Sequence, residues 1–313
     1  MKLEEYREYL QGQNIPDDTT EKQMAIVGDF LQFLTDLGLK ETTTSAGKKE
    51  VEQFARQLIT EGRNNLENFT ALGDYADWLD HRQLYVALIE VMDCHNALAV
   101  LADELEERHG RTVRNRIFSE ALPPLGAAEK ERCVYTQTVT AQMAQQITPK
   151  EARAAWFQVQ HGIPPEVWRE SDLADQEKYR QCGSIDEFLA LKRQERDTLL
   201  TRLRDERKLW YTIEINDEVL EFIKSDPEME GGRREGNKVY ITKVPYNAVR
   251  YLHATEAKMK RYYACHCPLL REAILNDWPI SPDVCHCSLG HASHYLAGLG
   301  LEVKGEVLES AIK

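Results

Sequence analysis

Apolar side chains recur at three- and four-residue spacing along the first 120 residues, and this period is typical of amphipathic helices. Glycine closes the first two stretches, at Gly38 and Gly62, where helices commonly end. Because each such helix has one apolar face to bury, we expect the helices to pack together as a compact bundle. The stretches with this period are residues 24–37, 51–59, 66–79, 84–91 and 97–105.

A proline- and glycine-containing segment, Pro123-Pro124-Leu125-Gly126, interrupts the helical pattern. Proline removes a backbone donor and glycine loosens the chain, so this segment can neither continue a helix nor easily enter the middle of a sheet. We therefore place a domain boundary here. It predicts an N-terminal domain over residues 1–122 and a C-terminal domain over residues 129–313.

Beyond the boundary the pattern mixes helices with strands. Thr148 and Ser184 each stand three residues before a glutamate, an arrangement that predicts a capped helix start. Alternating apolar or β-branched residues predict short strands. We expect an α+β fold: an all-helical N-terminal bundle followed by a domain with a small antiparallel sheet. The predicted strands are residues 210–215, 238–243 and 301–312, and further helices are expected to start at Ser184, Asn216 and Pro245.

Net charge narrows the class of partner. The chain has 313 residues, 42% of them hydrophobic and 29% charged, and a formal charge of -13. Residues 1–120 hold 13 Lys and Arg against 23 Asp and Glu. Such a surface repels phosphate backbones and anionic lipids, so nucleic acid and membranes are disfavoured as partners. The composition leaves a homodimer open.

No stretch of the sequence approaches the roughly 20 consecutive apolar residues of a membrane-spanning helix, and the N-terminal residues lack the apolar run of a secretory signal. Of the seven cysteines, four crowd into residues 265–287, while Cys94, Cys133 and Cys182 stand alone. This uneven spread favours reduced thiols over a disulfide framework. A cytoplasmic protein is therefore expected.

The crowded cysteines form two Cys-x-Cys pairs with seventeen residues between them. Four thiols match the four-coordinate preference of zinc and the thiolate ligation of iron–sulfur clusters. Pro268 follows the first pair and Pro282 precedes the second, and a turn or helix end lets one ion reach two thiols two residues apart. The predicted ligands are Cys265, Cys267, Cys285 and Cys287, with zinc as the metal and an iron–sulfur cluster as the alternative.

Other interpretations of the same segment stay open. A histidine could replace a cysteine as ligand. Alternatively the thiols are unmetallated and reactive, because a thiolate at a helix start is favoured by the helix dipole and by a neighbouring histidine. Inert buried thiols are the third interpretation. The alternate ligands are His266, His286, His291 and His294, and the catalytic candidates are Cys267, Cys285 and His286.

Aromatic side chains flank the cysteines and suggest a pocket for a small organic molecule, although aromatics at such spacing also build ordinary cores. The sequence contains no Walker loop, dinucleotide glycine fingerprint, Gly-x-Ser-x-Gly elbow or His-Glu-x-x-His motif. The candidate pocket residues are Tyr262, Tyr263, Trp278 and Tyr295.

Three functions follow as hypotheses. The leading one is a small-molecule-binding protein with a cysteine-ligated zinc near its pocket. The second is a hydrolase or redox enzyme that acts on a small sulfur- or nitrogen-containing molecule through a cysteine thiolate. The third is an interaction protein whose acidic bundle docks a basic partner while the cysteines are structural.

The stretch Lys260-Arg261-Tyr262-Tyr263-Ala264-Cys265-His266-Cys267-Pro268 resembles an uncharacterised prokaryotic family, as do Cys285-His286-Cys287-Ser288-Leu289-Gly290 and Val307-Leu308-Glu309-Ser310. Some members of that family are described as aminothiazoline-carboxylate hydrolases. The C-terminal part is also distantly similar to the 4-vinyl reductase type of ligand-binding domain. That resemblance implies an α+β module with cysteine-bound zinc near a pocket, and it carries over only the four paired cysteines.

The sequence departs from this family pattern at one place. Relatives continue past the Leu308-Glu309-Ser310 stretch into Gly-Asp-x-x-Cys-Arg-Phe, which is not found here. The departure weakens any metal site that needs the further cysteine.

Overall fold

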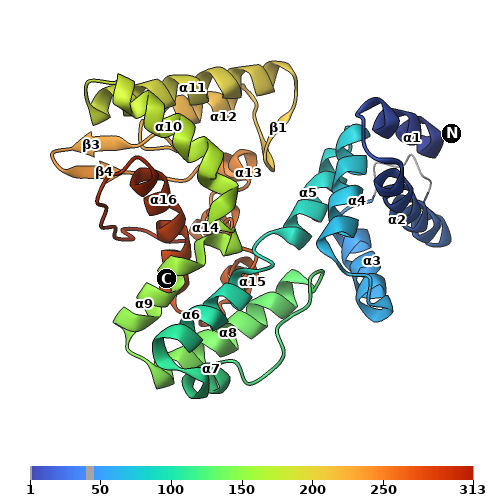
Figure 1. Cartoon of the computed structure of the whole chain (residues 1–313), viewed down its shortest axis with the longest axis horizontal. Helices are drawn as coiled ribbons and strands as arrows, with labels where there is room; N and C mark the ends of the chain where they lie inside the picture. The colour runs from blue at the N-terminus through green and yellow to red at the C-terminus, as the bar shows by residue number, and fades with distance from the viewer. Residues whose placement is uncertain (1, 40–45, 313) are drawn as a thin grey trace. The chain divides into compact units, whose positions relative to one another are not determined.

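The computed structural model describes residues 2–39 and 46–312, and the protein has a mostly helical α+β fold (Figure 1). It divides into two compact units. The first contains the chain up to His95 together with Pro123–Arg132; the second contains Asn96–Leu122 and the chain from Cys133 onward. Residues 96–122 were assigned to the N-terminal domain from their helical pattern, but they group with the second unit. A helical period shows that a face is buried and does not show against which core.

The first unit is an all-helical bundle, as the apolar stripes predict. Its core is rich in aromatic rings; Tyr6 and Tyr75, for example, meet edge to face at 5.0 Å between ring centroids. Gly62 ends one helix in the left-handed conformation, with a φ of 69°. The helices are α1 (Lys2–Gly12), α2 (Asp17–Asp36), α3 (Lys48–Glu61), α4 (Leu66–Trp78) and α5 (Arg82–Met92).

Residues 82–109 form the one described stretch that is long and apolar enough to cross a membrane by length and composition. In the structure this stretch is two helices, α5 and α6 (Ala97–His109), joined by a turn. Several of their apolar side chains, among them Leu88 and Leu101, are buried in the protein. A core helix of a water-soluble protein passes the same test, so this stretch is weak evidence for a membrane span.

Helices dominate the second unit, and the predicted caps open two of them. The Thr148 side chain accepts a hydrogen bond from the Glu151 N–H, and the Ser184 side chain accepts one from the Glu187 N–H. The helices that follow α6 are α7 (Arg111–Ile117), α8 (Glu129–Gln146), α9 (Pro149–Val159), α10 (Arg169–Gln181), α11 (Ile185–Asp205), α12 (Asp217–Ser225), α13 (Ala248–His253), α14 (Ala257–Ala264), α15 (Arg271–Asn276) and α16 (His286–Gly298).

The strands are shorter than predicted and form two separate antiparallel hairpins. The expected strand 210–215 is itself a hairpin of β1 (Leu209–Trp210) and β2 (Ile213–Glu214). Tyr211 adopts a φ of 54° and turns the chain between them. In the second hairpin, β3 (Arg233–Glu235) pairs with β4 (Lys238–Tyr240), so the predicted strand 238–243 ends early.

Two other predicted elements are wrong in detail. The helix expected from Pro245 begins at Ala248, where the Asn247 side chain caps it, and it is broken before α14. Residues 301–312 form no regular strand, and this segment pairs with none of the described strands. Leu301 and Val303 instead pack against the core cluster around Phe188. The alternating positions Val303 and Val307 are half-buried and Gly305 is exposed, so the predicted buried face is not formed. A strand needs a partner as well as alternation.

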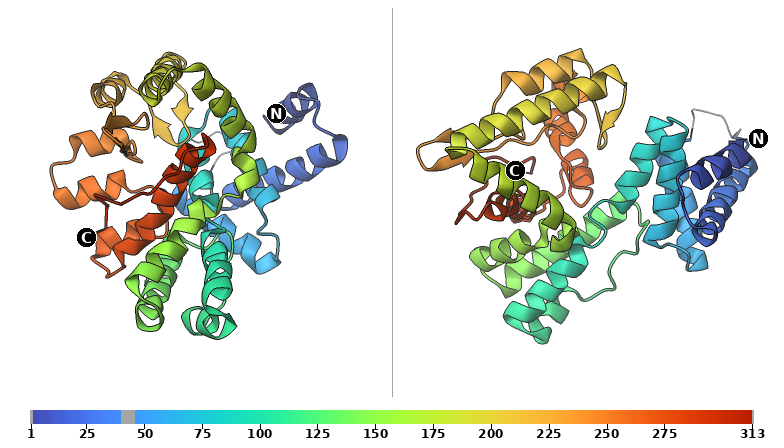
Figure 2. Two further views of the ribbon diagram at one scale, coloured as in Figure 1. Left: turned by 60° about the vertical axis from the view of Figure 1, so that its left-hand side comes forward. Right: turned by 45° about the horizontal axis from the view of Figure 1, so that its top comes forward.

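The second unit has more than one core cluster. One surrounds Leu200 and Val219, and another joins Phe188 to Leu296 and Leu299 at the end of α16. Helix α16 also packs closely against α9, and the views in Figures 1 and 2 show the two running side by side. This close pair of helices carries part of the candidate site.

Candidate functional site

The four paired cysteines lie at helix ends and turns. Cys265 directly follows α14, and its N–H bonds to the Arg261 carbonyl at 3.1 Å. Cys267 opens the next turn, because its carbonyl accepts the Leu270 N–H at 3.0 Å. Cys285 ends the short helix η3 (Pro282–Cys285), and Cys287 lies in the first turn of α16.

The two Cys-x-Cys segments meet at one place, where Cys265 and Cys287 are buried and Cys267 and Cys285 are half-buried. Burial, followed by the charge of Cys267, raises the pKa of the Cys265 thiol well above its usual range. The same two causes raise the pKa of Cys285 to about 11 and that of Cys287 to about 12. Since each of these thiols feels the charge of Cys267, all four belong to one electrostatic cluster.

Two cationic side chains adjoin this cluster. The charge of Lys243 acts to lower the pKa of Cys285 and Cys287, and that of Arg271 does the same for Cys265, although burial outweighs both. Arg271 is only 4% exposed, and its guanidinium carbon lies 4.2 Å from the centre of the Tyr246 ring. Stacking on an aromatic face is a common way to hold a buried guanidinium.

His161 completes the cluster, and it was not predicted from the sequence. Its backbone N–H donates to the Cys287 sulfur at 3.0 Å, and its ring Nδ1 lies 3.7 Å from the same sulfur. Burial and the charge of Lys243 lower the pKa of His161 well below its usual range. A neutral imidazole therefore adjoins the Cys287 thiol.

An unusual turn presents His161. Gln160, His161 and Gly162 form the short helix η1, and all three have positive φ, at 43°, 62° and 73°. Left-handed backbone costs free energy in residues other than glycine and occurs in single residues rather than runs. Such strain persists only when the surrounding structure holds it, and it clusters at functional sites.

Two glycines allow the close approaches that hold this turn. A Cβ on Gly162 would stand 2.6 Å from the Ala97 nitrogen, and one on Gly290 would stand 1.8 Å from the Phe157 carbonyl oxygen. Gly290 therefore lets α16 approach the end of α9. This approach brings Cys287, one turn earlier on α16, within hydrogen-bond distance of the His161 N–H.

The histidines predicted as alternate ligands have partners other than a cysteine sulfur. His266 Nε2 lies 2.6 Å from the Val244 carbonyl oxygen, and His286 Nδ1 lies 3.2 Å from that of Asp283. His294 Nε2 lies 3.0 Å from an Asp172 carboxylate oxygen. The ring of His291 packs against the rings of His161 and Trp168, with centroids 5.1 and 5.0 Å away.

The predicted aromatic residues are dispersed around the cysteines. Tyr262 and Tyr263 contact each other at 5.4 Å between ring centroids. Tyr295 stacks on Phe188 at 6.3 Å within a core cluster, which is the ordinary structural role that aromatics of this spacing often have. Trp278 is partly buried directly after α15. Their role as pocket residues stays a prediction.

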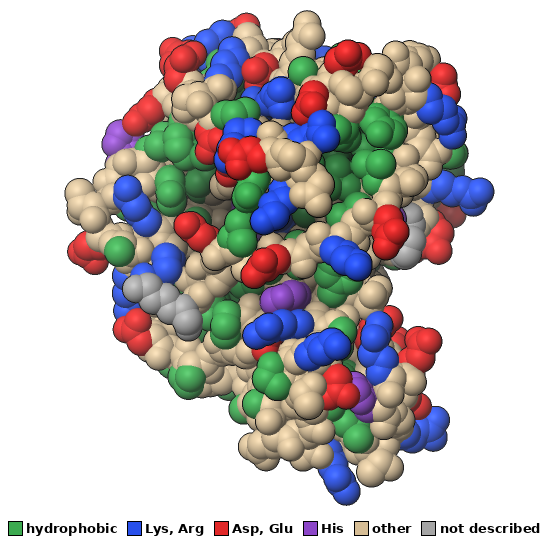
Figure 3. Space-filling view, turned by 90° about the vertical axis from the view of Figure 1, so that its left-hand side faces the viewer, with side chains coloured by type: hydrophobic (Ala, Val, Ile, Leu, Met, Phe, Trp, Pro, Cys, Tyr) green, Lys and Arg blue, Asp and Glu red, His purple; other side chains and the backbone are tan. Residues whose placement is uncertain are grey.

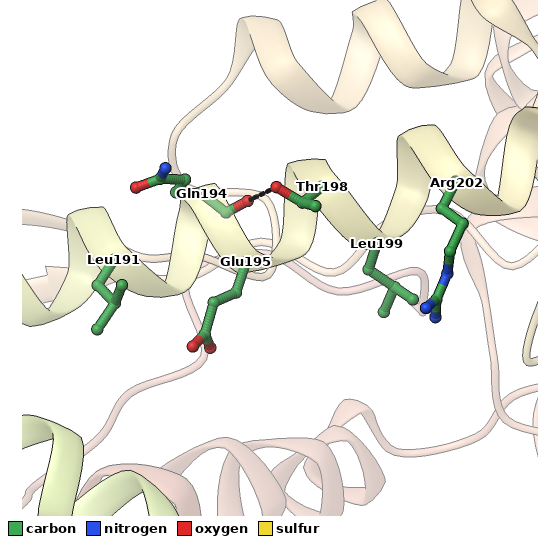
Figure 4. Close-up of a pocket in the computed structure, with 6 residues that line it drawn as sticks. All are labelled: Leu191, Gln194, Glu195, Thr198, Leu199 and Arg202. Atoms are coloured by element: carbon green, nitrogen blue, oxygen red, sulfur yellow. Dashed lines mark hydrogen bonds between the residues drawn. The ribbon is translucent and has the colours of Figure 1, made fainter.

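A surface hollow lies elsewhere, along α11. Figure 4 shows Leu191, Glu195, Leu199 and Arg202 pointing to one side of this helix, and the Thr198 hydroxyl bonded to the Gln194 carbonyl. Every residue that lines this hollow comes from α11, so no other helix or strand contributes a side chain to it. The face drawn in Figure 3 mixes basic and acidic side chains with apolar ones.

Among residues 2–39 and 46–312, no group of three or more Cys, His, Asp or Glu side chains is arranged to hold a metal ion. The four thiols fit a zinc ion in kind and in number, but their sulfurs are not placed as a ligand group. The predicted zinc and iron–sulfur cofactors therefore stay predictions.

Comparisons with protein-family models, with curated proteins and with solved structures find no match to this chain. The resemblance to the prokaryotic double Cys-x-Cys family is not tested by them and stays a prediction.

Proposed function

We propose that the second unit binds a thiophilic metal ion, most simply zinc, through Cys265, Cys267, Cys285 and Cys287, beside a site for a small organic molecule. The observation that carries the metal-binding proposal is the meeting of four thiols from two segments in one buried cluster. Thiolates brought this close together would repel one another. A divalent cation would offset that repulsion. The small-molecule part rests on the aromatic residues that flank the cysteines in the sequence and on the family resemblance.

The charges around the cluster support this proposal. Four thiolates around one divalent ion leave two negative charges uncompensated. Lys243 and Arg271 bring two positive charges to the same cluster. Two nearby cations are thus matched to a tetrathiolate complex, whereas they would only repel a divalent ion bound by neutral ligands.

Metal binding requires the sulfurs to draw together, because they are not placed as ligands in the described structure. Cys265 and Cys267 lie on the turn between α14 and α15, outside regular helix, where small rearrangements cost little. Reduced thiols of this kind are maintained in the cytoplasm, which is the compartment we propose.

The test is the metal content of the protein, purified with reductant and without chelator. We expect stoichiometric zinc in the wild type and in Cys182→Ser, a matched control outside the cluster. The double variant Cys265→Ser with Cys285→Ser should lose it. A metal-free wild type, or full retention in the double variant, would contradict the proposal. Iron found together with sulfide would show that the site holds an iron–sulfur cluster instead of zinc.

A second candidate function is a cysteine-dependent enzyme, and the contact between Cys287 and His161 favours it. A thiol beside an imidazole at a helix start is the arrangement of many cysteine nucleophiles. This pair differs from the candidates Cys267, Cys285 and His286 that the sequence suggested. The pKa of Cys287, raised to about 12 by burial, argues for a protonated thiol in the resting state.

Alkylation rates of the individual cysteines separate the two candidates. A cysteine nucleophile predicts that one thiol in metal-free protein reacts far faster than the rest at neutral pH. Uniformly slow alkylation, followed residue by residue with mass spectrometry, would exclude the enzyme candidate and leave the metal proposal unaffected.

A further inference from the structure

The geometry points to Lys243 as a positioning residue: we propose that it fixes the tautomer of His161, so that residue 161 directs two N–H groups at the sulfur of Cys287. This assigns a role to two residues, Lys243 and His161, that stand outside the cysteine pattern. The inference adds to the proposed metal site. The tautomer can be measured by itself, and only the expected effect on zinc binding rests on the proposed function.

Lys243 determines the direction of the hydrogen bonds at the His161 ring. Lys243 Nζ lies 3.2 Å from His161 Nε2 and 3.4 Å from the Ser288 hydroxyl oxygen. An ammonium group has three N–H donors and no acceptor, so Nε2 must accept. A ring nitrogen that accepts carries no proton, and the single proton of a neutral imidazole then resides on Nδ1.

The ring is neutral for reasons that lie in its surroundings. Burial is the largest cause of its lowered pKa, and the charges of Lys243, His291 and His266 act in the same direction. Those three side chains come from three separate elements around the ring. A second ring proton would lie on Nε2 and face the Lys243 ammonium group at 3.2 Å.

The Cys287 sulfur then accepts both the ring N–H and the backbone N–H of His161. Nδ1–H faces the Cys287 sulfur at 3.7 Å, and the backbone N–H of His161 reaches the same atom at 3.0 Å. Hydrogen bonds to sulfur favour the thiolate over the thiol. These two N–H groups favour negative charge on the Cys287 sulfur, as a metal ligand or as a nucleophile, and so act against the burial that raises its pKa to about 12.

The backbone supports a functional role for this arrangement. At this turn, where Gln160, His161 and Gly162 are all left-handed, residue 161 directs both its main-chain and its ring N–H at one sulfur. The fold also leaves the Gln160 amide oxygen buried without a hydrogen-bond partner among the described residues. The left-handed backbone and the unpaired Gln160 oxygen both lower the stability of the fold. Their presence at one turn indicates that the turn has a functional role.

The direct test is nitrogen-15 NMR of the histidine rings in the full-length protein, with His161 assigned by loss of its signals in His161→Gln. We expect wild-type His161 to be protonated at Nδ1 and unprotonated at Nε2. Lys243→Met should shift the ring toward the Nε2–H tautomer, while Lys243→Arg, which keeps charged donors, should retain the wild-type pattern. Lys238→Met, an exposed change on β4, is the matched control.

The outcomes decide the inference without relying on any one variant. A wild-type ring protonated at Nε2, or an unchanged tautomer in folded Lys243→Met, would overturn it. Under the proposed function, Lys243→Met should also weaken zinc binding by about 10- to 100-fold, as loss of an outer-shell partner typically does. An Nδ1–H tautomer in protein that binds no metal would count against the proposed function alone.

Discussion

At the residue scale, Gly290 is the position where a single added methyl group tests the site most sharply. A Cβ there would stand 1.8 Å from the Phe157 carbonyl oxygen, well inside the contact distance. We expect Gly290→Ala to force α9 and α16 apart and to lower the free energy of unfolding by about 1–3 kcal/mol, the usual cost of overpacking. The His161 contact to Cys287 should weaken as well.

Urea unfolding measures this effect, followed by tryptophan fluorescence, because four of the five tryptophans lie in the second unit. The matched control is Gly28→Ala, in the middle of α2, where nothing stands within 4 Å of the added Cβ. Alanine should stabilise that helix slightly. Equal stability of Gly290→Ala and the wild type would show that the close helix approach is not needed.

Some residues of the site could be predicted from the sequence and others could not. The cysteines stand close together in a recognisable spacing, so they could be singled out, although the chemistry they perform could not. His161 and Lys243 could not be found in this way, because they lie 126 and 45 residues from their contacts Cys287 and Ser288. The only local signal was His161-Gly162 before a proline break, which many loops share.

At the element scale, the start of α9 offers a test of a capping box through pH. The Glu151 carboxylate accepts hydrogen bonds from the Thr148 N–H at 2.8 Å and from its hydroxyl at 2.7 Å, and these lower the pKa of Glu151. A depressed folded-state pKa stabilises the protein above the unfolded-state pKa, and this contribution is lost as pH falls through the folded-state pKa.

We therefore expect Glu151→Gln to unfold at a lower temperature than the wild type at neutral pH. The difference should shrink as the pH falls below about 4.3, the ordinary value for glutamate, and vanish once wild-type Glu151 is protonated. Thermal unfolding by circular dichroism from pH 7 to pH 3 checks this. A difference that stays constant over that range would rule out a carboxylate contribution to the cap.

Elements were predictable where their signal is local. Helices α2 to α5 of the first unit follow from their apolar stripes, and α9, α11 and α12 follow from their caps, whereas α1 was not predicted. The strands were predicted less well, because the partner of a strand can lie anywhere in the chain. Tyr211 turns one predicted strand into a hairpin through a positive φ that nothing in its residue type announces.

At the scale of the whole molecule, the site belongs to one of two compact units. A ligand that binds one unit stabilises that unit and leaves the other unchanged unless the two are coupled. We expect zinc, added to metal-free protein, to slow amide hydrogen exchange in peptides around 261–298 and the turn at 160–162. Peptides from residues 2–39 and 46–92 should exchange as before.

Mass spectrometry of the exchanged peptides gives this result in a single experiment. Protection that spreads evenly over both units would show that the two units respond together. No change anywhere would contradict zinc binding to the thiol cluster.

The central claim is that four sulfurs from two segments bind one ion, and cobalt tests it most directly. Cobalt substitutes for zinc at thiolate sites and absorbs light through its bonds to sulfur. We expect cobalt-loaded wild type and Cys182→Ser to show this absorption with the bands of a tetrahedral site. Single serine variants of Cys265, Cys267, Cys285 and Cys287 should each weaken it. Absence of sulfur-to-cobalt absorption in the wild type, or its full retention after loss of either Cys-x-Cys pair, would contradict the account.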